Sequence, residues 1–150
     1  MSKQFPVIMI TGSRQVGKST LLNYISSNEK TNINYVTLDN IRNRALALED
    51  PELFLETFKP SLTIDEFQYV PNLLSYIKII VDETRIDELF NDGEKIKTLY
   101  YLTGLQNFLA MEEVTESLAG RIGIIDLYGL SNRKLIGIGS RLFIPEIEEL

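Results

Sequence analysis

Hydrophobic residues along the chain follow two patterns, short apolar runs and longer segments in which apolar residues recur with helical spacing. The short runs are rich in β-branched and aromatic residues, which favours strands. They predict five strands, at residues 5–11, 33–38, 61–66, 98–103 and 121–128. The first run, Phe5 to Thr11, is apolar almost throughout, as is typical of a central parallel strand that is buried on both faces.

The segments between these runs predict helices, at residues 18–27, 41–48, 51–58, 71–83 and 105–118. In the fourth segment, apolar residues fall at positions i, i+1, i+4, i+7 and i+8, the spacing of an amphipathic helix. Asp50 is expected to cap the third helix, with Pro51 at its first position. We therefore assign Asp50 a structural role.

Two polar segments are expected to interrupt the helices. Residues 84–97 are mostly charged and contain the turn signal Asn91-Asp92-Gly93, which predicts a surface connection. The pair Glu112-Glu113 favours a break within the fifth helix.

Strands that alternate with helices predict an α/β fold. We expect a three-layer sandwich with a central five-stranded parallel sheet, right-handed crossovers and helices on both faces. Ligands of such sheets bind at the carboxyl ends of the strands. Residues 1–130 are expected to form one core, and the weakly patterned residues 131–150 a short C-terminal extension.

A phosphate-binding motif follows the first strand. The pattern G-x-x-x-x-G-K-S lies between this strand and the first helix, which is the context that a P-loop requires. Gly12 and Gly17 allow positive φ angles and a close approach of the backbone to phosphate. Lys18 would reach the β- and γ-phosphates, and Ser19 would offer its hydroxyl to Mg²⁺. The nucleotide is expected to contact Gly12, Ser13, Arg14, Gln15, Val16, Gly17, Lys18, Ser19 and Thr20. The alternative is a glycine-rich turn that binds nothing.

The third predicted strand ends in Asp65-Glu66, a second signal for phosphoryl transfer. Such chemistry needs a metal ion and a group that activates the attacking water. Asp65 is suited to the Mg²⁺ contact and Glu66 to the water. The alternative is a solvated strand end in which Asp65 caps a turn.

Two further residues are candidates for the same site. Thr103 ends the fourth strand, and its hydroxyl would hold the γ-phosphate or the water if that strand lies between the first and the third. Arg121 would stabilise the transition state from its own subunit or from a neighbour. Each has an ordinary structural alternative, a strand-terminal threonine and an exposed arginine, and the sequence leaves both open.

Composition narrows the chemistry. The 150 residues include no cysteine and no histidine, which excludes disulfides, thiolate metal sites and histidine-based catalysis. The net charge of −6 gives no general basic field for nucleic acid. No apolar run reaches transmembrane length and the N-terminus lacks a signal-peptide pattern, so we expect a cytoplasmic protein without a membrane anchor.

Four segments occur in one order and together resemble the AAA-type domain of a large group of bacterial and archaeal ATPases: Ile10 to Thr20, Ile64 to Pro71, Leu102 to Gly104 and Ser117 to Arg121. The resemblance runs from about Phe5 to Leu130. It implies a P-loop NTPase of AAA-like fold that binds ATP with Mg²⁺. It also implies a Walker A motif at Gly12 to Ser19, a Walker B motif at Asp65 and Glu66, and a sensor region at Thr103. The preference for adenine rests on this resemblance, since the N-K-x-D motif of GTPases is absent.

The chain departs from that group in two places. Leu105 stands where the group usually has serine, and only about twenty weakly patterned residues follow Leu130, where members usually carry winged-helix and nuclease-like parts. We interpret the chain as a truncated relative, in which nucleotide binding is better supported than turnover.

Two functions therefore compete. The intact Asp65-Glu66 pair favours Mg²⁺-dependent ATP binding with slow hydrolysis. Leu105 and the missing C-terminal region favour a non-hydrolysing, ATP-dependent switch or assembly module. Either function is compatible with a homo-oligomer or a protein partner. A small-molecule kinase ranks third, because it would need a lid with arginines and residues 84–97 supply only Arg85.

Overall fold

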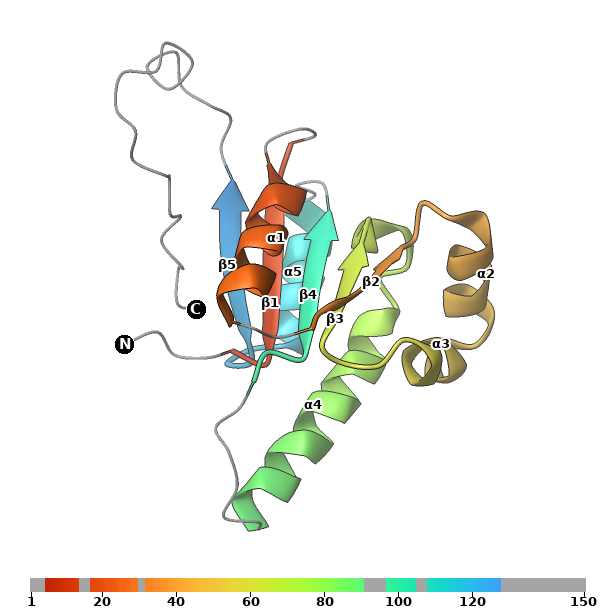
Figure 1. Ribbon diagram of the computed structural model, residues 1–150. Coiled ribbons are helices and arrows are strands. Elements are labelled where there is room, and N and C mark those ends of the chain that lie inside the picture. The colour runs from red at the N-terminus through yellow and green to blue at the C-terminus, as the bar shows by residue number, and fades with distance from the viewer. Residues whose placement is uncertain (1–4, 14–16, 30–31, 91–96, 105–107, 128–150) are drawn as a thin grey trace, which may run out of the picture.

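The structure, a computed structural model, describes residues 5–13, 17–29, 32–90, 97–104 and 108–127. Within these residues the chain alternates between strands and helices, as predicted (Figure 1). The elements in order are β1 (Val7–Gly12), α1 (Lys18–Glu29), β2 (Asn34–Thr37), α2 (Ile41–Glu49), α3 (Pro51–Thr57), β3 (Leu62–Asp65), the 3₁₀ turn η1 (Phe67–Tyr69), α4 (Leu73–Phe90), β4 (Tyr100–Gly104), α5 (Phe108–Ser117) and β5 (Ile122–Leu127).

The five strands form one sheet in the order β2-β3-β4-β1-β5. Every neighbouring pair is parallel, which confirms the predicted five-stranded parallel sheet. β4 lies between β1 and β3, so its carboxyl end stands between the loop that follows β1 and the acidic end of β3. This order meets the condition on which the prediction for Thr103 depended.

Helices cover both faces of the sheet, with α1 on one face and α4 and α5 on the other (Figure 1). The larger core packs the side chains of one sheet face against α3, α4 and α5, with Phe54, Ile77 and Leu118 fully buried. The smaller core packs the opposite face against α1 through Leu22. The layers are therefore helix, sheet and helix, as the alternating sequence pattern predicted.

Helix boundaries follow local capping. Asp50 accepts a hydrogen bond of 3.0 Å from the backbone N–H of Leu53, and Pro51 is the first residue of α3, so the predicted cap is confirmed. The expected surface connection from Thr84 onward is wrong, because α4 continues to Phe90. Its charged residues are compatible with an exposed helix, and the Thr84 hydroxyl donates to the carbonyl oxygen of Ile80.

The break expected in the fifth helix is also wrong. α5 runs without interruption from Phe108 to Ser117, so Glu112-Glu113 lies inside it. Glutamate has a high intrinsic helix propensity, so two successive glutamates need not end a helix. The turn Asn91-Asp92-Gly93, Leu105 and the extension at 131–150 lie outside the described residues.

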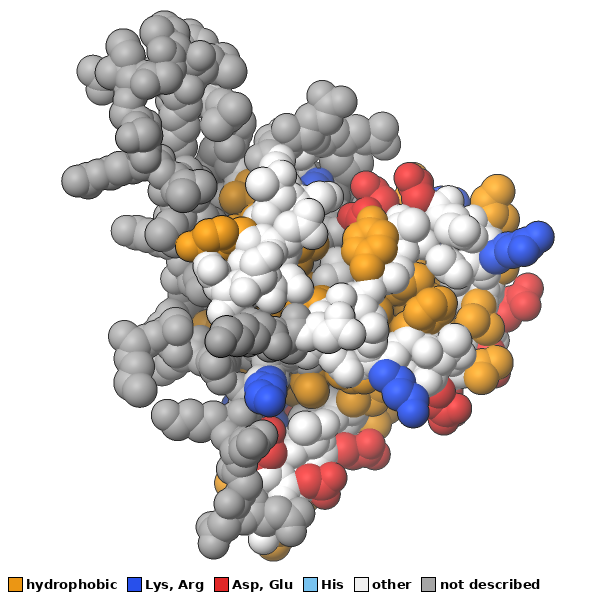
Figure 2. All heavy atoms as spheres, in the orientation of Figure 1, with side chains coloured by type: hydrophobic (Ala, Val, Ile, Leu, Met, Phe, Trp, Pro, Cys, Tyr) orange, Lys and Arg blue, Asp and Glu red, His pale blue; other side chains and the backbone are white. Residues whose placement is uncertain are grey.

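No helix in the described ranges is both long and apolar enough to span a bilayer. On the face shown in Figure 2, the coloured Lys and Arg side chains are scattered among acidic ones and do not gather into one basic patch. This face of the described residues therefore offers no continuous positive surface.

Candidate functional site

The P-loop geometry begins with its two glycines. Gly12 and Gly17 have φ angles of 150° and 97°, as the motif predicted. Gly17 has open space where a Cβ would stand, so its backbone angle is what disfavours other residues there. α1 begins at Lys18, and its first turn holds Ser19 and Thr20 with no acidic side chain. The first turn of this helix therefore holds no carboxylate that would compete with an anion for its positive end.

The remaining loop positions divide into two groups. Ser13, Ser19 and Thr20 are exposed next to the described part of the loop. Arg14, Gln15 and Val16, which the motif also assigns to the nucleotide, lie outside the described residues.

Lys18 turns back toward the sheet. Its ammonium donates hydrogen bonds to the carbonyl oxygen of Gly12 at 3.0 Å and to that of Gly104 at 3.1 Å. The two carbonyls come from β1 and β4, which are neighbours in the sheet. The lysine charge is thus held at the carboxyl edge of both strands, where a phosphate would enter.

Asp65 is the central carboxylate of the site. The buried Thr103, at the end of β4, donates its hydroxyl to Asp65 Oδ1. Tyr35, on β2, donates its hydroxyl to Asp65 Oδ2 over 2.7 Å. The structure therefore brings Thr103 and Asp65 together, and it adds a tyrosine that sequence reasoning missed.

Tyr35 escaped notice because no motif contains it. It is paired in register with Thr63, two residues before Asp65, so the contact depends on the alignment of β2 with β3. Partial burial, followed by the hydrogen bond to Asp65, raises the pKa of Tyr35 to about 12. Only its place in a predicted strand hinted that it could reach the end of a neighbouring strand.

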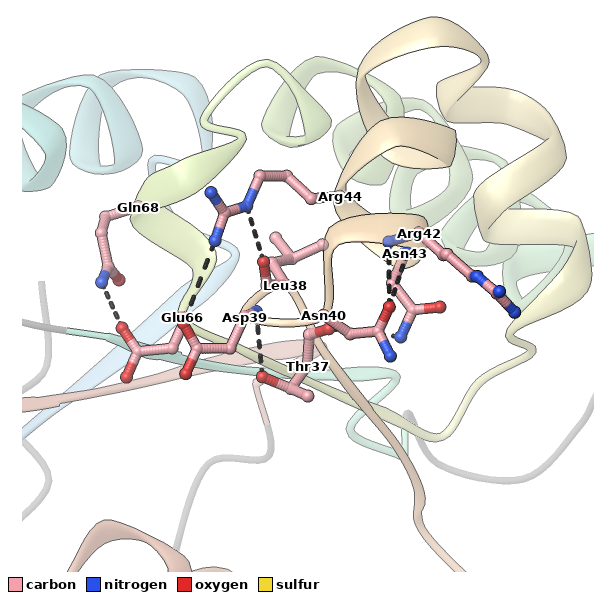
Figure 3. A network of polar contacts seen from close by, with 9 residues as sticks. All are labelled: Thr37, Leu38, Asp39, Asn40, Arg42, Asn43, Arg44, Glu66 and Gln68. Atoms are coloured by element: carbon pink, nitrogen blue, oxygen red, sulfur yellow. Dashed lines mark hydrogen bonds and ion pairs between the residues drawn. The ribbon is translucent and has the colours of Figure 1, made fainter.

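Glu66 follows β3 in an unusual conformation. Its φ angle of 56° is left-handed, which for a non-glycine residue is uncommon and costs on the order of 1 kcal/mol. Its carboxylate accepts a hydrogen bond from the side-chain amide of Gln68, which points at it in Figure 3. A left-handed turn directly after the strand thus sets the direction of Glu66.

Gln68 in turn packs against the end of β4. A Cβ atom at Gly104 would collide with Gln68 Oε1, so the absence of a side chain at Gly104 makes room for this amide. Gly104 therefore has two roles, since its carbonyl oxygen also accepts from Lys18.

The turn between β2 and α2 lies beside the segment that carries Glu66 and Gln68 (Figure 3). Asn40 caps α2 by accepting from the backbone N–H groups of Arg42 and Asn43. Arg44 donates from Nε to the carbonyl oxygen of Leu38 at 2.8 Å, and its guanidinium carbon lies 3.8 Å from the ring centroid of Tyr69. These contacts tie α2 to the segment that carries Glu66 and Gln68.

Arg121 is the one predicted catalytic residue that the structure does not bring to the loop. It precedes β5, and its carbonyl oxygen accepts from the N–H of Val7 at the amino end of β1. The length of β1, about 17 Å at 3.3 Å per residue, separates that end from Gly12. Its Nε donates to Asp82 Oδ1 at 2.5 Å. Action across a subunit interface stays a prediction.

The oxygen donors at this edge fit a magnesium ion. Mg²⁺ prefers oxygen ligands and is commonly bound by one or two protein groups together with substrate phosphates. Ser19 and Asp65 supply a hydroxyl and a carboxylate. Among the described residues no three His, Cys, Asp or Glu side chains form a metal-binding group, so a cation here would depend largely on phosphate oxygens.

Comparisons with known proteins agree with this geometry. Residues 4–136 match a family model described as an AAA domain. Uncharacterized proteins of Mycobacterium tuberculosis and Mycobacterium bovis are each 32% identical to the chain over 130 residues. The alignment covers 85% of this chain and 26% of each mycobacterial protein, so the chain spans about a quarter of the length of these relatives.

Among solved structures, a variant of RuvB from Thermotoga maritima resembles the chain with a TM-score of 0.50 and 21% sequence identity. The match covers 80% of this chain and 37% of the RuvB chain. At this level of identity the likeness shows a shared fold.

Proposed function

The chain belongs to the family of AAA domains, which implies nucleotide binding at its P-loop, and from this premise we propose that it binds Mg-ATP and hydrolyses it slowly. The phosphates would lie on the loop from Gly12 and at the first turn of α1. Lys18 would exchange its two carbonyl partners for phosphate oxygens. Ser19 and Asp65 would hold the magnesium ion.

One observation supports this proposal above the others. Lys18 donates to the carbonyl oxygen of Gly104, and the preceding residue, Thr103, donates to Asp65. Two successive residues at the end of β4 thus link the lysine of the phosphate loop to Asp65, the carboxylate proposed to hold the metal ion. A phosphate that draws Lys18 away from Gly104 would come to lie beside Thr103 and Asp65.

Hydrolysis needs a base for the attacking water. The oxygen of the water forms a bond to the γ-phosphorus, the bond from this phosphorus to the bridging oxygen of ADP breaks, and the water proton must be accepted. Glu66 follows Asp65 directly at the carboxyl end of β3, and its carboxylate is held by the hydrogen bond from Gln68, so it is suited to accept this proton. Bound Mg²⁺ supplies neutralisation of the phosphate charge.

A non-hydrolysing switch or assembly module is the second candidate. The observation that favours it is the ion pair of Arg121 with Asp82 at the opposite edge of the sheet, since none of the described arginines is hydrogen-bonded or ion-paired to Asp65 or Glu66. An arginine beside the transferred phosphoryl group raises its rate of hydrolysis strongly. Without one, the bound ATP would persist and act as a ligand.

A single-turnover assay tests the proposal. Protein in excess over labelled ATP and Mg²⁺ is followed for ADP over hours, for the wild type, Asp65→Asn and the control Asp50→Asn. Asparagine can also cap a helix, so the control should hydrolyse ATP as the wild type does. We expect the wild type and Asp50→Asn to form ADP, and Asp65→Asn to form little. ATP recovered intact from the wild type would instead support the switch.

A further inference from the structure

Tyr35 makes a contact that the proposed mechanism does not use. Its hydroxyl donates to Asp65 Oδ2 at 2.7 Å. The residue lies on β2, the edge strand beside β3, and its register partner Thr63 stands two residues before Asp65. Residues two apart in a strand project from the same face, which explains how the tyrosine reaches the carboxylate.

The two hydroxyl groups hold the Asp65 carboxylate from both sides. Thr103, on β4, donates to Oδ1, while Tyr35, on β2, donates to Oδ2. β3 lies between these two strands, so the donors come from opposite directions. Each carboxylate oxygen has two acceptor positions, and among the described residues one position on each oxygen has no donor. The two hydrogen bonds thus restrict rotation of the carboxylate. The carboxylate can still bind a cation, or a water molecule that is coordinated to a cation.

We propose that Tyr35 is a positioning residue that orients Asp65 toward the magnesium ion of Mg-ATP, an inference that rests on the proposed function. Tyr35 acts through Asp65 and is not itself a catalytic residue. Without its hydroxyl, Asp65 would be held by Thr103 alone, and metal binding would have to order a carboxylate that is otherwise free to turn. Hydrogen-bond partners of metal ligands typically change metal affinity or activity by about 10- to 100-fold.

The effect at Tyr35 should be smaller, because 58% of this residue is exposed and water can replace part of the contact. We expect Tyr35→Phe to lose about three- to tenfold in ATP affinity, and only when the metal ion is present. The affinity for ATP in the absence of Mg²⁺ depends on the loop and on Lys18, and within the described residues the Tyr35 hydroxyl is bonded to Asp65 and not to Lys18.

Calorimetric titration with ATP, in Mg²⁺ and in EDTA, tests this inference on the wild type and on Tyr35→Phe. Phenylalanine keeps the ring and removes only the donor. Tyr24→Phe is the matched control, since Tyr24 lies on α1 and is similarly exposed at 47%. The ratio of the ATP affinity in Mg²⁺ to the ATP affinity in EDTA should fall about three- to tenfold in Tyr35→Phe. The ATP affinity of Tyr35→Phe in EDTA should equal that of the wild type. Tyr24→Phe should keep the wild-type affinity under both conditions.

The outcomes separate this inference from the function on which it rests. A wild type that binds no ATP overturns both. A wild type that binds ATP more tightly with Mg²⁺, together with an unchanged ratio in Tyr35→Phe, overturns the role of Tyr35 alone. An equal loss in Mg²⁺ and in EDTA, or an equal loss in Tyr24→Phe, would show a general structural effect and would also overturn it.

Discussion

Lys18 and Gly104 are 86 positions apart in the sequence, yet the ammonium of one donates a 3.1 Å hydrogen bond to the carbonyl oxygen of the other. The contact exists because β4 is inserted beside β1 in the sheet. It joins the phosphate loop to the strand that carries Thr103, and it keeps the lysine charge at the edge where ATP would bind.

Replacing Lys18 by alanine should weaken ATP binding. The variant loses a charge-assisted contact with phosphate, which is worth about 2–4 kcal/mol. Calorimetry in Mg²⁺ measures the difference, with Lys59→Ala as a control at an exposed lysine near the end of α3. An unchanged affinity for ATP in Lys18→Ala would show that the loop is not the binding site.

Gly104→Ala should separate binding from chemistry. The new Cβ would displace the end of the flexible Gln68 side chain, and Glu66 would lose its hydrogen-bond donor. We expect ATP affinity within about threefold of the wild type and hydrolysis lowered by about tenfold, as for other losses of a supporting contact. Gln68→Ala should reproduce this effect in a single-turnover assay. Wild-type hydrolysis in both variants would rule out a role for Gln68.

Tyr100→Phe should stabilise the fold. Tyr100 is fully buried, and its hydroxyl has no hydrogen-bond partner in the described part of the chain. An unsatisfied buried hydroxyl costs about 1–3 kcal/mol, so removing it should raise the free energy of unfolding by about 1 kcal/mol. Urea denaturation at pH 8 measures this gain, with the exposed Tyr24→Phe as a control that should show none.

The same residue predicts a dependence on alkaline pH. Burial raises the pKa of Tyr100 from 10.0 to about 12. Between these values the unfolded chain releases the proton while the folded chain keeps it, so the stability from this group is present below pH 10 and is lost as the pH rises toward 12. Between pH 8 and pH 11, the free energy of unfolding should fall by about 1 kcal/mol more in the wild type than in Tyr100→Phe. Equal losses in the two proteins would contradict the assignment.

The sequence predicted the elements of the site better than their connections. The P-loop and the Asp65-Glu66 pair are local patterns, and five strands could be counted from apolar runs. The strand order is a property of the whole sheet, so the place of Thr103 beside Asp65 was only a conditional expectation. The contact of Tyr35 with Asp65 depends on register, which a single sequence does not specify.

The errors have similar causes. Residues 84–90 were expected to form a surface connection because they are charged, but a long exposed helix tolerates charge on most of its surface. For Arg121 the sequence left a catalytic and a structural role open, and its position before β5 puts it at the amino edge of the sheet, away from the phosphate loop of its own chain. Motif membership does not specify which edge of a sheet a residue occupies.

Arg121 leads to a prediction about assembly. If it acts across a subunit interface, hydrolysis per subunit should rise with protein concentration, and Arg121→Ala should abolish this rise. Asp82→Ala removes the partner of Arg121 within the chain and should preserve the rise. The ion pair is partly exposed, so neither variant should lose more than about 1 kcal/mol of stability. A flat rate over a wide concentration range would exclude the interface role.

Glu66→Gln provides the most direct test of the proposed ATPase function. Glutamine keeps the size of the side chain but cannot accept a proton from water, while the loop, Ser19 and Asp65 are untouched. Single-turnover hydrolysis and ATP affinity are measured on the same preparations of wild type and variant. We predict equal affinity in Mg²⁺ and hydrolysis slowed by roughly 10²–10⁴-fold, with ATP trapped on the variant. Hydrolysis that is equally fast in the two proteins would contradict the role of Glu66 and leave another group, first of all Thr103, to activate the water.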